Sequence, residues 1–163
     1  AGVLPRSQTR AHTAEVQTVT VEPRNRVVVH GRRREDSVEG LAEAHVVIGI
    51  GRGIGPDDVH VLDELRDLLG AELGCTRKIT DAGWMPHARQ IGITGRAIAP
   101  RLFISIGASG KFNHMVGVRG AGTVLAINPD PDALVFEVAD VGIVATYQEV
   151  ADLLVGELRA AIG

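Results

Sequence analysis

The sequence has few of the features that mark disulfide-bonded, membrane-spanning or nucleic-acid-binding proteins. Its single cysteine, Cys75, excludes an intramolecular disulfide and a metal site built from several cysteines. No apolar run approaches the ~20 residues that a membrane-spanning helix needs. Seventeen basic against 20 acidic residues give a net charge of -3, which argues against broad attraction to nucleic acid or an anionic membrane. We therefore expect a soluble, cytoplasmic protein that binds a small molecule or another protein, with no metal ligands.

The chain is long enough for one hydrophobic core. With 163 residues and 45% hydrophobic side chains, it can bury roughly two-thirds of the surface that the unfolded chain exposes. Residues 1–14 are polar and aperiodic, and weak strand patterns follow at 16–21 and 27–30. We therefore predict an N-terminal tail or remnant with weak strands over residues 1–44, and one main domain over residues 45–163.

Short apolar strands alternate with helical patterns through the main domain. Strands are predicted at 46–50, 102–106, 123–127 and 142–145, and helices from Pro56, at about 110–118 and at 147–162. The predicted apolar faces are Leu62, Leu65, Leu69 and Leu73 on the first helix, and Val150, Leu153, Leu154, Leu158 and Ile162 on the last. This alternation indicates an open, doubly wound α/β domain, with a mostly parallel sheet covered by helices on both faces.

In a doubly wound sheet, ligands bind at the carboxyl ends of the strands. The glycine-rich turn at 49–55 follows a strand and precedes a helix, so its backbone amides and Arg52 could hold a phosphate. A plain tight turn explains the same glycines. A long irregular stretch begins at Asp81 and contains the turn at 91–95. This turn carries Thr94, whose hydroxyl could bond either a ligand ring or its own backbone.

Two later turns leave the same choice open. In the turn at 107–115, Ser109 could be a helix N-cap, and His114 is either structural or a contact for negative charge. Asn128 ends the next strand before two X-Pro steps, and Asp140 precedes the last strand. Both side chains could hold ribose or adenine, or they could serve ordinary turn chemistry.

Taken in order, these turns resemble one known family. The segments DAGW, HARQIGITGR, APRLFISIGASGKFNHM and AINPDPDALVFEVADVGIVAT resemble the C-terminal domain of the electron transfer flavoprotein alpha subunit, and the likeness covers about residues 46–162. The resemblance implies a Rossmann-like domain that binds FAD. The positions it gives for cofactor binding are Arg52, Thr76, Arg77, Ile91, Gly92, Ile93, Thr94, Ser109, Gly110, Lys111, Phe112, Asn113, His114, Asn128 and Asp140.

The resemblance also implies roles within this set. It places Arg77 near the flavin ring, the Thr94 hydroxyl toward the reactive ring nitrogen and His114 near the pyrimidine end. Asn128 and Asp140 would contact the adenosine half. His114, Arg77 and a helix N-terminus would stabilise the negative charge of reduced flavin. Since no residue is assigned as a catalyst, we expect an electron carrier and not an enzyme with its own substrate.

Four positions depart from the family pattern. Ile93 and Asn113 each stand where the family has glutamine, Thr76 replaces serine, and Lys111 replaces a small residue. Losing the amide at position 93 removes one candidate hydrogen bond to the flavin.

The resemblance implies a heterodimer with an electron transfer flavoprotein beta subunit, with the flavin between the two chains. Electrons would come from acyl-CoA-type or other dehydrogenases and pass to a quinone-linked or other acceptor. Two alternatives remain open. The chain could be a nicotinamide- or thiamine-type cofactor-binding domain of an oxidoreductase, or a non-redox assembly scaffold.

Overall fold

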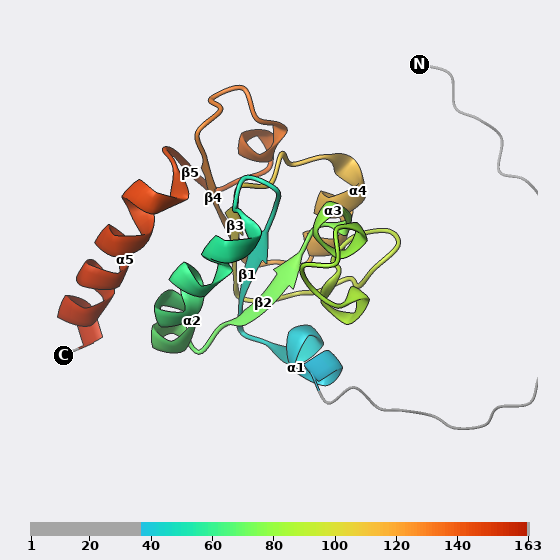
Figure 1. The fold of residues 1–163 in the computed structure, drawn as a ribbon, viewed down its shortest axis with the longest axis horizontal. Helices are drawn as coiled ribbons and strands as arrows, with labels where there is room; N and C mark the ends of the chain where they lie inside the picture. The colour runs from blue at the N-terminus through green and yellow to red at the C-terminus, as the bar shows by residue number, and fades with distance from the viewer. Residues whose placement is uncertain (1–36, 163) are drawn as a thin grey trace, which may run out of the picture. The chain divides into compact units, whose positions relative to one another are not determined.

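The computed structural model describes residues 37–162. The strands predicted at 16–21 and 27–30 lie outside this range. Figure 1 shows the described part as a central sheet with helices on either side.

The sheet is parallel throughout. Its strands are β1 (Val46–Ile50), β2 (Glu72–Cys75), β3 (Leu102–Ile106), β4 (Thr123–Asn128) and β5 (Val141–Val144). Among the described residues they pair in the order β2-β1-β3-β4-β5, and every neighbouring pair is parallel. The order changes direction between β1 and β3, which is where doubly wound sheets open a crevice for ligands. The predicted fold class is confirmed.

Two hydrophobic clusters hold helices against the two faces of the sheet. On one face lie the 3-10 helix η1 (Pro56–Leu62), α2 (Asp63–Leu69) and α5 (Tyr147–Ile162). On the other lie α1 (Ser37–Glu43), α4 (Phe112–Met115) and the 3-10 helices η3 (Val116–Val118) and η4 (Leu134–Glu137). Alternate residues of β1 serve the two faces, because Ile48 packs in the first cluster and Val47 in the second. In residues 37–162, no helix combines the length and apolarity that crossing a membrane requires.

Three details of the predicted elements are wrong. The first helix ends at Leu69, because Gly70 adopts a left-handed conformation with φ 56, and Leu73 lies in β2. Leu153 is 70% exposed, since α5 covers the sheet with a narrow stripe that contacts α2 and β4. The helix predicted at 110–118 is shorter, and divides into α4 and η3.

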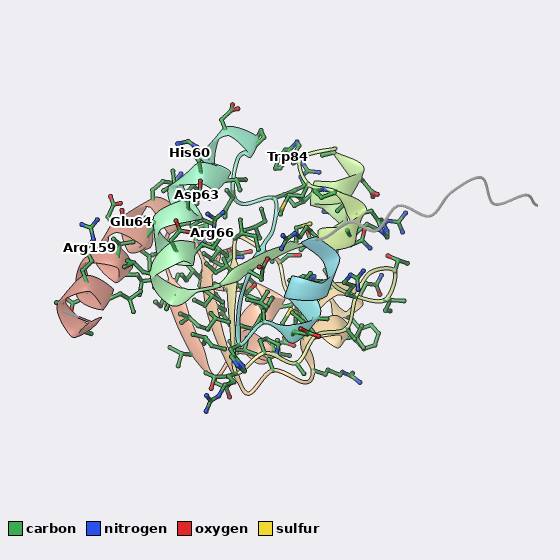
Figure 2. The ribbon with its side chains drawn as sticks, turned by 90° about the horizontal axis from the view of Figure 1, so that it is seen from below. His60, Asp63, Glu64, Arg66, Trp84 and Arg159 are labelled. Atoms are coloured by element: carbon green, nitrogen blue, oxygen red, sulfur yellow. The ribbon has the colours of Figure 1, made fainter. Side chains whose placement is uncertain are left out.

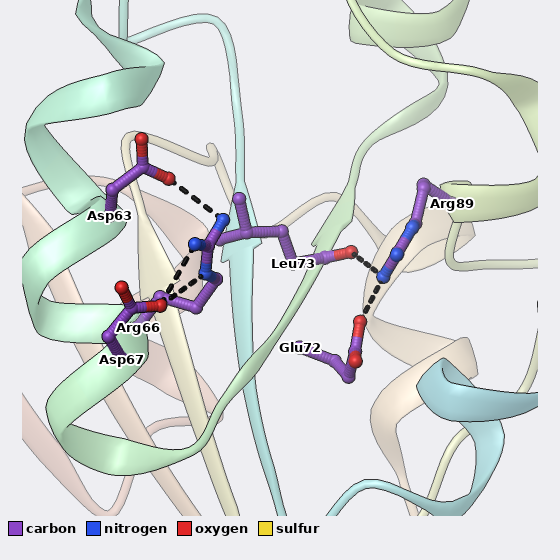
Figure 3. A network of polar contacts seen from close by, with 6 residues as sticks. All are labelled: Asp63, Arg66, Asp67, Glu72, Leu73 and Arg89. Atoms are coloured by element: carbon purple, nitrogen blue, oxygen red, sulfur yellow. Dashed lines mark hydrogen bonds and ion pairs between the residues drawn. The ribbon is translucent and has the colours of Figure 1, made fainter. Parts of the chain in front are cut away.

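Polar contacts fasten the helices and the segment before β3. Arg159 on α5 forms an ion pair with Glu64 on α2 (Figure 2). Arg89 from η2 (His87–Arg89) donates to the Leu73 carbonyl at 3.1 Å and pairs with Glu72; Figure 3 shows both contacts. Both Leu73 and Glu72 belong to the edge strand β2, so these contacts fix the segment before β3 to that strand, where the segment can contribute to the ligand crevice.

Candidate functional site

The turns after β1 and β3 pack directly against each other. The Gly51 amide donates to the Ile106 carbonyl at 2.9 Å, and the Gly53 amide donates to the Gly107 carbonyl at 2.9 Å. A Cβ at Gly51 would lie 2.4 Å from the Cα of Ala108, and one at Gly53 would lie 2.7 Å from the Cα of Gly107. Glycine is therefore required at both positions for the turns to approach, whatever ligand is bound.

A cavity of about 310 Å³ opens beside these two turns, at the switch point of the sheet. That volume is at the lower end of the roughly 300–1,000 Å³ usual for ligand pockets. The residues that line it are Gly51, Arg52, Thr76, Arg77, Lys78, Gln90, Ile91, Ile93, Thr94, Gly107, Ala108, Ser109, Gly110, Lys111, Asn113 and His114. Most of the predicted cofactor-binding residues therefore converge on this one cavity.

The cavity wall is positively charged. Arg52, Arg77, Lys78 and Lys111 line it, and none of the described lining residues is a carboxylate. Arg77 Nε lies 3.2 Å from Asp81 Oδ2, but both side chains are more than 60% exposed. Exposed ion pairs of this kind are weak, so Arg77 remains able to turn toward an anion. The arrangement favours a ligand that carries negative charge.

His114 lines the cavity and has one buried ring nitrogen without a partner among the described residues. The residue is 7% exposed, and its Nδ1 lies 3.0 Å from the Ile91 carbonyl oxygen. Because a carbonyl only accepts, Nδ1 must carry the proton, and Nε2 is left buried with no hydrogen-bond partner within residues 37–162. Burial lowers the pKa of the His114 imidazole, and the bond to Ile91 opposes this in part. Such a buried orphan on a cavity wall is the position where a polar ligand atom fits.

Thr94 is held by a buried glutamine. Gln90 is 2% exposed, and its Nε2 donates to Thr94 Oγ1 at 2.8 Å. Its Oε1 lies 2.8 Å from the hydroxyl oxygen of Thr80, on α3 (Arg77–Asp81). Gln90 is absent from the predicted cofactor residues, although it belongs to the segment HARQIGITGR that carries the resemblance. That membership and its spacing of four residues before Thr94 were the available signals.

Ser109 does not cap a helix, although that was the structural role open to it. The helix α4 begins at Phe112 after Lys111, and no side chain makes a cap hydrogen bond there. Ser109 instead lines the cavity, next to Gly110, whose φ of 76 is left-handed.

Four of the predicted cofactor residues lie off the cavity wall: Gly92, Phe112, Asn128 and Asp140. The first two have structural contacts of their own. Gly92 has a φ of 129, and a Cβ there would lie 2.2 Å from the Asn113 carbonyl oxygen. Phe112 is 60% exposed, and the guanidinium of Arg119 stacks 5.4 Å from its ring centroid. Gly92 shapes the wall without lining it, and Phe112 faces elsewhere.

The two residues predicted to contact adenosine also bond within the fold. Asn128 Nδ2 donates to the Ala108 carbonyl at 3.0 Å, which supports the turn after β3. Asp140 Oδ2 accepts the backbone amide of Val124 at 2.8 Å. Their contact with a cofactor stays a prediction.

A second hollow of about 520 Å³ lies beside α4, η4 and the start of β4. Apolar side chains dominate its lining, and Phe112, Leu134 and Val138 are 48–60% exposed. The lining residues are Gly110, Phe112, Met115, Val116, Val118, Arg119, Ala121, Gly122, Val124, Leu134, Glu137, Val138 and Asp140. Gly110 is the residue that this second hollow shares with the cavity.

Comparison with known proteins identifies the family. Residues 40–119 match the model of the electron transfer flavoprotein FAD-binding domain. The chain is 41% identical over 124 residues to an electron transfer flavoprotein subunit alpha from Thermoanaerobacterium thermosaccharolyticum, covering 76% of this chain and 38% of that protein.

Two further curated relatives and one solved structure also match this chain. Protein FixB of Bradyrhizobium diazoefficiens is 40% identical, over 79% of this chain and 35% of its own length. A putative electron transfer flavoprotein subunit, YdiR of Escherichia coli, is 36% identical over 94% of this chain and 51% of its own length. The chain thus spans about half or less of these curated relatives. A putative sugar-phosphate isomerase from Listeria monocytogenes aligns over 79% of this chain and 78% of its own, with 14% identity and a TM-score of 0.39, a likeness too weak to support an inference.

The cavity has the chemistry that the flavin end of FAD requires. FAD carries a negatively charged pyrophosphate and a planar ring rich in hydrogen-bonding atoms. The four cationic side chains suit the charge, and the unpaired Nε2 of His114 offers a polar partner for a ring atom. These matches and this fit show that the chain carries the FAD-binding domain of the electron transfer flavoprotein alpha family, and that its cofactor is FAD.

Proposed function

We propose that this chain forms the flavin-holding part of an electron carrier. The observation that carries the proposal is the buried, unpaired Nε2 of His114 on the wall of a cavity lined by cations. Bound FAD supplies the chemistry, because it accepts and releases electrons. The chain's own residues bind the cofactor, orient it and adjust its charge environment.

Each side chain has a distinct task in this proposal. The cavity-lining members of the predicted set hold the flavin end, with the Thr94 hydroxyl toward the reactive ring nitrogen. Arg77 is assigned near the flavin ring, where its permanent charge would favour added negative charge. His114 is assigned near the pyrimidine end. Asn128 and Asp140 are assigned to the adenosine half. No residue acts as a nucleophile or proton-transfer catalyst, so the protein is a carrier and not an enzyme with its own substrate.

A beta subunit completes the site in this proposal. Ile93 lines the cavity and is 59% exposed, as expected of an apolar side chain that a second protein or a flavin ring covers. The proposed electron donors are acyl-CoA-type or other dehydrogenases, and the acceptor is quinone-linked or another redox protein. A cytoplasmic location remains a prediction from the sequence.

The test is to co-express the full chain with a beta subunit and purify the pair by gel filtration in the absence of free FAD. We expect flavin absorbance to coelute with the chain in stoichiometric amount. Arg119→Ala, which removes a cation from the second hollow, should keep that amount. A colourless pair that ignores added FAD would contradict the proposal.

A further inference from the structure

The side chain of Gln90 links two hydroxyl groups through the cavity wall. Its Oε1 lies 2.8 Å from Thr80 Oγ1 and its Nε2 lies 2.8 Å from Thr94 Oγ1. With 2% exposure, the carboxamide cannot exchange these partners for bulk water. Its orientation is therefore decided by the two threonines.

The backbone of Gln90 also fixes the turn that carries Thr94. The Arg96 amide donates to the Gln90 carbonyl at 2.8 Å. A Cβ at Gly95 would lie 2.3 Å from the same carbonyl oxygen, so the turn closes tightly over Gln90. The distance between the carboxamide and the Thr94 hydroxyl is thus set by local structure and not by a flexible loop.

The link through Gln90 decides whether the Thr94 hydroxyl keeps its proton for a ligand. Thr80 has one hydroxyl proton and two acceptors within reach, the Arg77 carbonyl at 2.9 Å and Gln90 Oε1 at 2.8 Å. If the proton goes to Gln90, the carboxamide nitrogen donates to Thr94, whose own proton remains for the cavity. If it goes to Arg77, the carboxamide must turn over and accept the Thr94 proton. In that case Thr94 offers only lone pairs to a ligand.

We propose that Gln90 is a positioning residue that makes the Thr94 hydroxyl a hydrogen-bond donor to an acceptor nitrogen of the bound ring. The proposal rests on the proposed function, in which Thr94 faces the reactive nitrogen of FAD. In the structure, the carboxamide nitrogen lies toward Thr94 and its oxygen toward Thr80, which is the arrangement that leaves the Thr94 proton free. Gln90 itself acts only through Thr94.

Gln90→Glu reverses this arrangement in the full chain paired with its beta subunit. A carboxylate only accepts, so Thr94 must donate to it and has no proton left for the ligand. The probes are FAD and 5-deaza-FAD, which has a C–H in place of the reactive ring nitrogen. The two carry equal charge, so repulsion by the new carboxylate cancels in the ratio of their dissociation constants.

We expect the wild-type pair to bind FAD about three- to tenfold more tightly than 5-deaza-FAD, which is the worth of one hydrogen bond. In Gln90→Glu and in Thr94→Val the ratio should fall to about one. Gln148→Glu adds the same charge at an exposed position on α5 and should keep the wild-type ratio. If Gln90→Glu fails to fold, Thr94→Val and the spectra described below decide the proposal, because Gln90→Met would leave the Thr94 proton free for the ligand. An unchanged ratio in Gln90→Glu or in Thr94→Val, or no preference in the wild type, overturns the proposal.

A second measurement separates this proposal from the proposed function. In ¹⁵N spectra of the full chain without flavin, Thr94→Val and Thr80→Val should each shift the side-chain amide signals of Gln90. Signals that ignore Thr94→Val would show that the link is absent. If the wild-type pair binds neither flavin, the proposed function fails, while these spectra still decide whether Gln90 orients Thr94.

Discussion

The cavity and the second hollow share Gly110, yet their walls differ in kind. The cavity lies at the switch point of the sheet and combines four cations with the unpaired Nε2 of His114. The second hollow is lined mostly by apolar side chains, and its cation, Arg119, already stacks on Phe112. A buried polar atom without a partner and a surplus of cationic side chains, and not volume, distinguish the site for a polar cofactor, because the described lining of the larger hollow has neither.

Gly110→Ala should disturb the packing of both the cavity wall and the wall of the second hollow, and it should produce the largest loss of stability. A Cβ there would lie 2.0 Å from the Val135 backbone nitrogen, at a φ of 76 that disfavours side chains. We expect the free energy of unfolding in urea to fall by about 2–4 kcal/mol. Gly156→Ala in α5 meets open space and should gain about 0.5–1 kcal/mol. Equal stability of the two variants would contradict the close packing of Gly110.

Removing one arginine from the cavity and one from the second hollow tests whether the two walls differ in their affinity for FAD. Arg77→Ala should raise the dissociation constant of FAD about tenfold, or about 1.4 kcal/mol, because a charge-assisted contact to the ligand is lost. Arg119→Ala removes the same chemical group from the second hollow and should change that constant by less than about twofold. Titration of the apoprotein pair with FAD measures both. Similar losses in the two variants would show that the cations act only through general charge.

The smallest expected effect is a pH dependence of the free energy of unfolding, which comes from His114 on the cavity wall. Burial lowers the pKa of His114, so below its ordinary pKa of about 6.5 the unfolded chain takes up a proton that the folded chain refuses. The free energy of unfolding should therefore fall as the pH drops from 7.5 to 5.5.

His114→Gln should lose less stability over that interval than the wild type. His60→Gln, at an exposed position on η1, should keep the wild-type dependence. Urea unfolding at the two pH values supplies the measurement, and parallel curves for His114→Gln and wild type would argue against a neutral buried imidazole.

Much of the fold follows from local patterns, and the errors have physical causes. Apolar runs at β1 and β3 are unambiguous, because buried parallel strands carry few polar residues. The strand β2 was missed because Leu73 follows Leu69 at helical spacing, although Gly70 was the signal that ends the helix. Leu153 was placed on the packed face because its spacing from Val150 fits a helix stripe, and spacing does not tell how wide the covered surface is.

The site was predictable in outline and not in its connections. Glycine turns after strands indicate where a ligand binds, so Arg52, Ser109 and His114 could be proposed from position alone. The contact between Asn128 and Ala108 joins residues 20 apart in the sequence, which no local motif records. Gln90 contacts Thr94 and Thr80 across only four and ten residues, but in an irregular stretch where spacing does not fix the direction of a side chain. Residues that face a ligand are therefore easier to predict from a sequence than the residues that orient them.

The amide-to-carbonyl contact between Gly53 and Gly107 has a consequence for protein engineering. The two turns act as a matched pair, since neither leaves room for a side chain on the other. A designer who transplants the first turn into another parallel-sheet scaffold must transplant its counterpart as well. Directed evolution of cofactor preference should accordingly vary Arg52 and Ser109 in one library, while both glycines are kept constant.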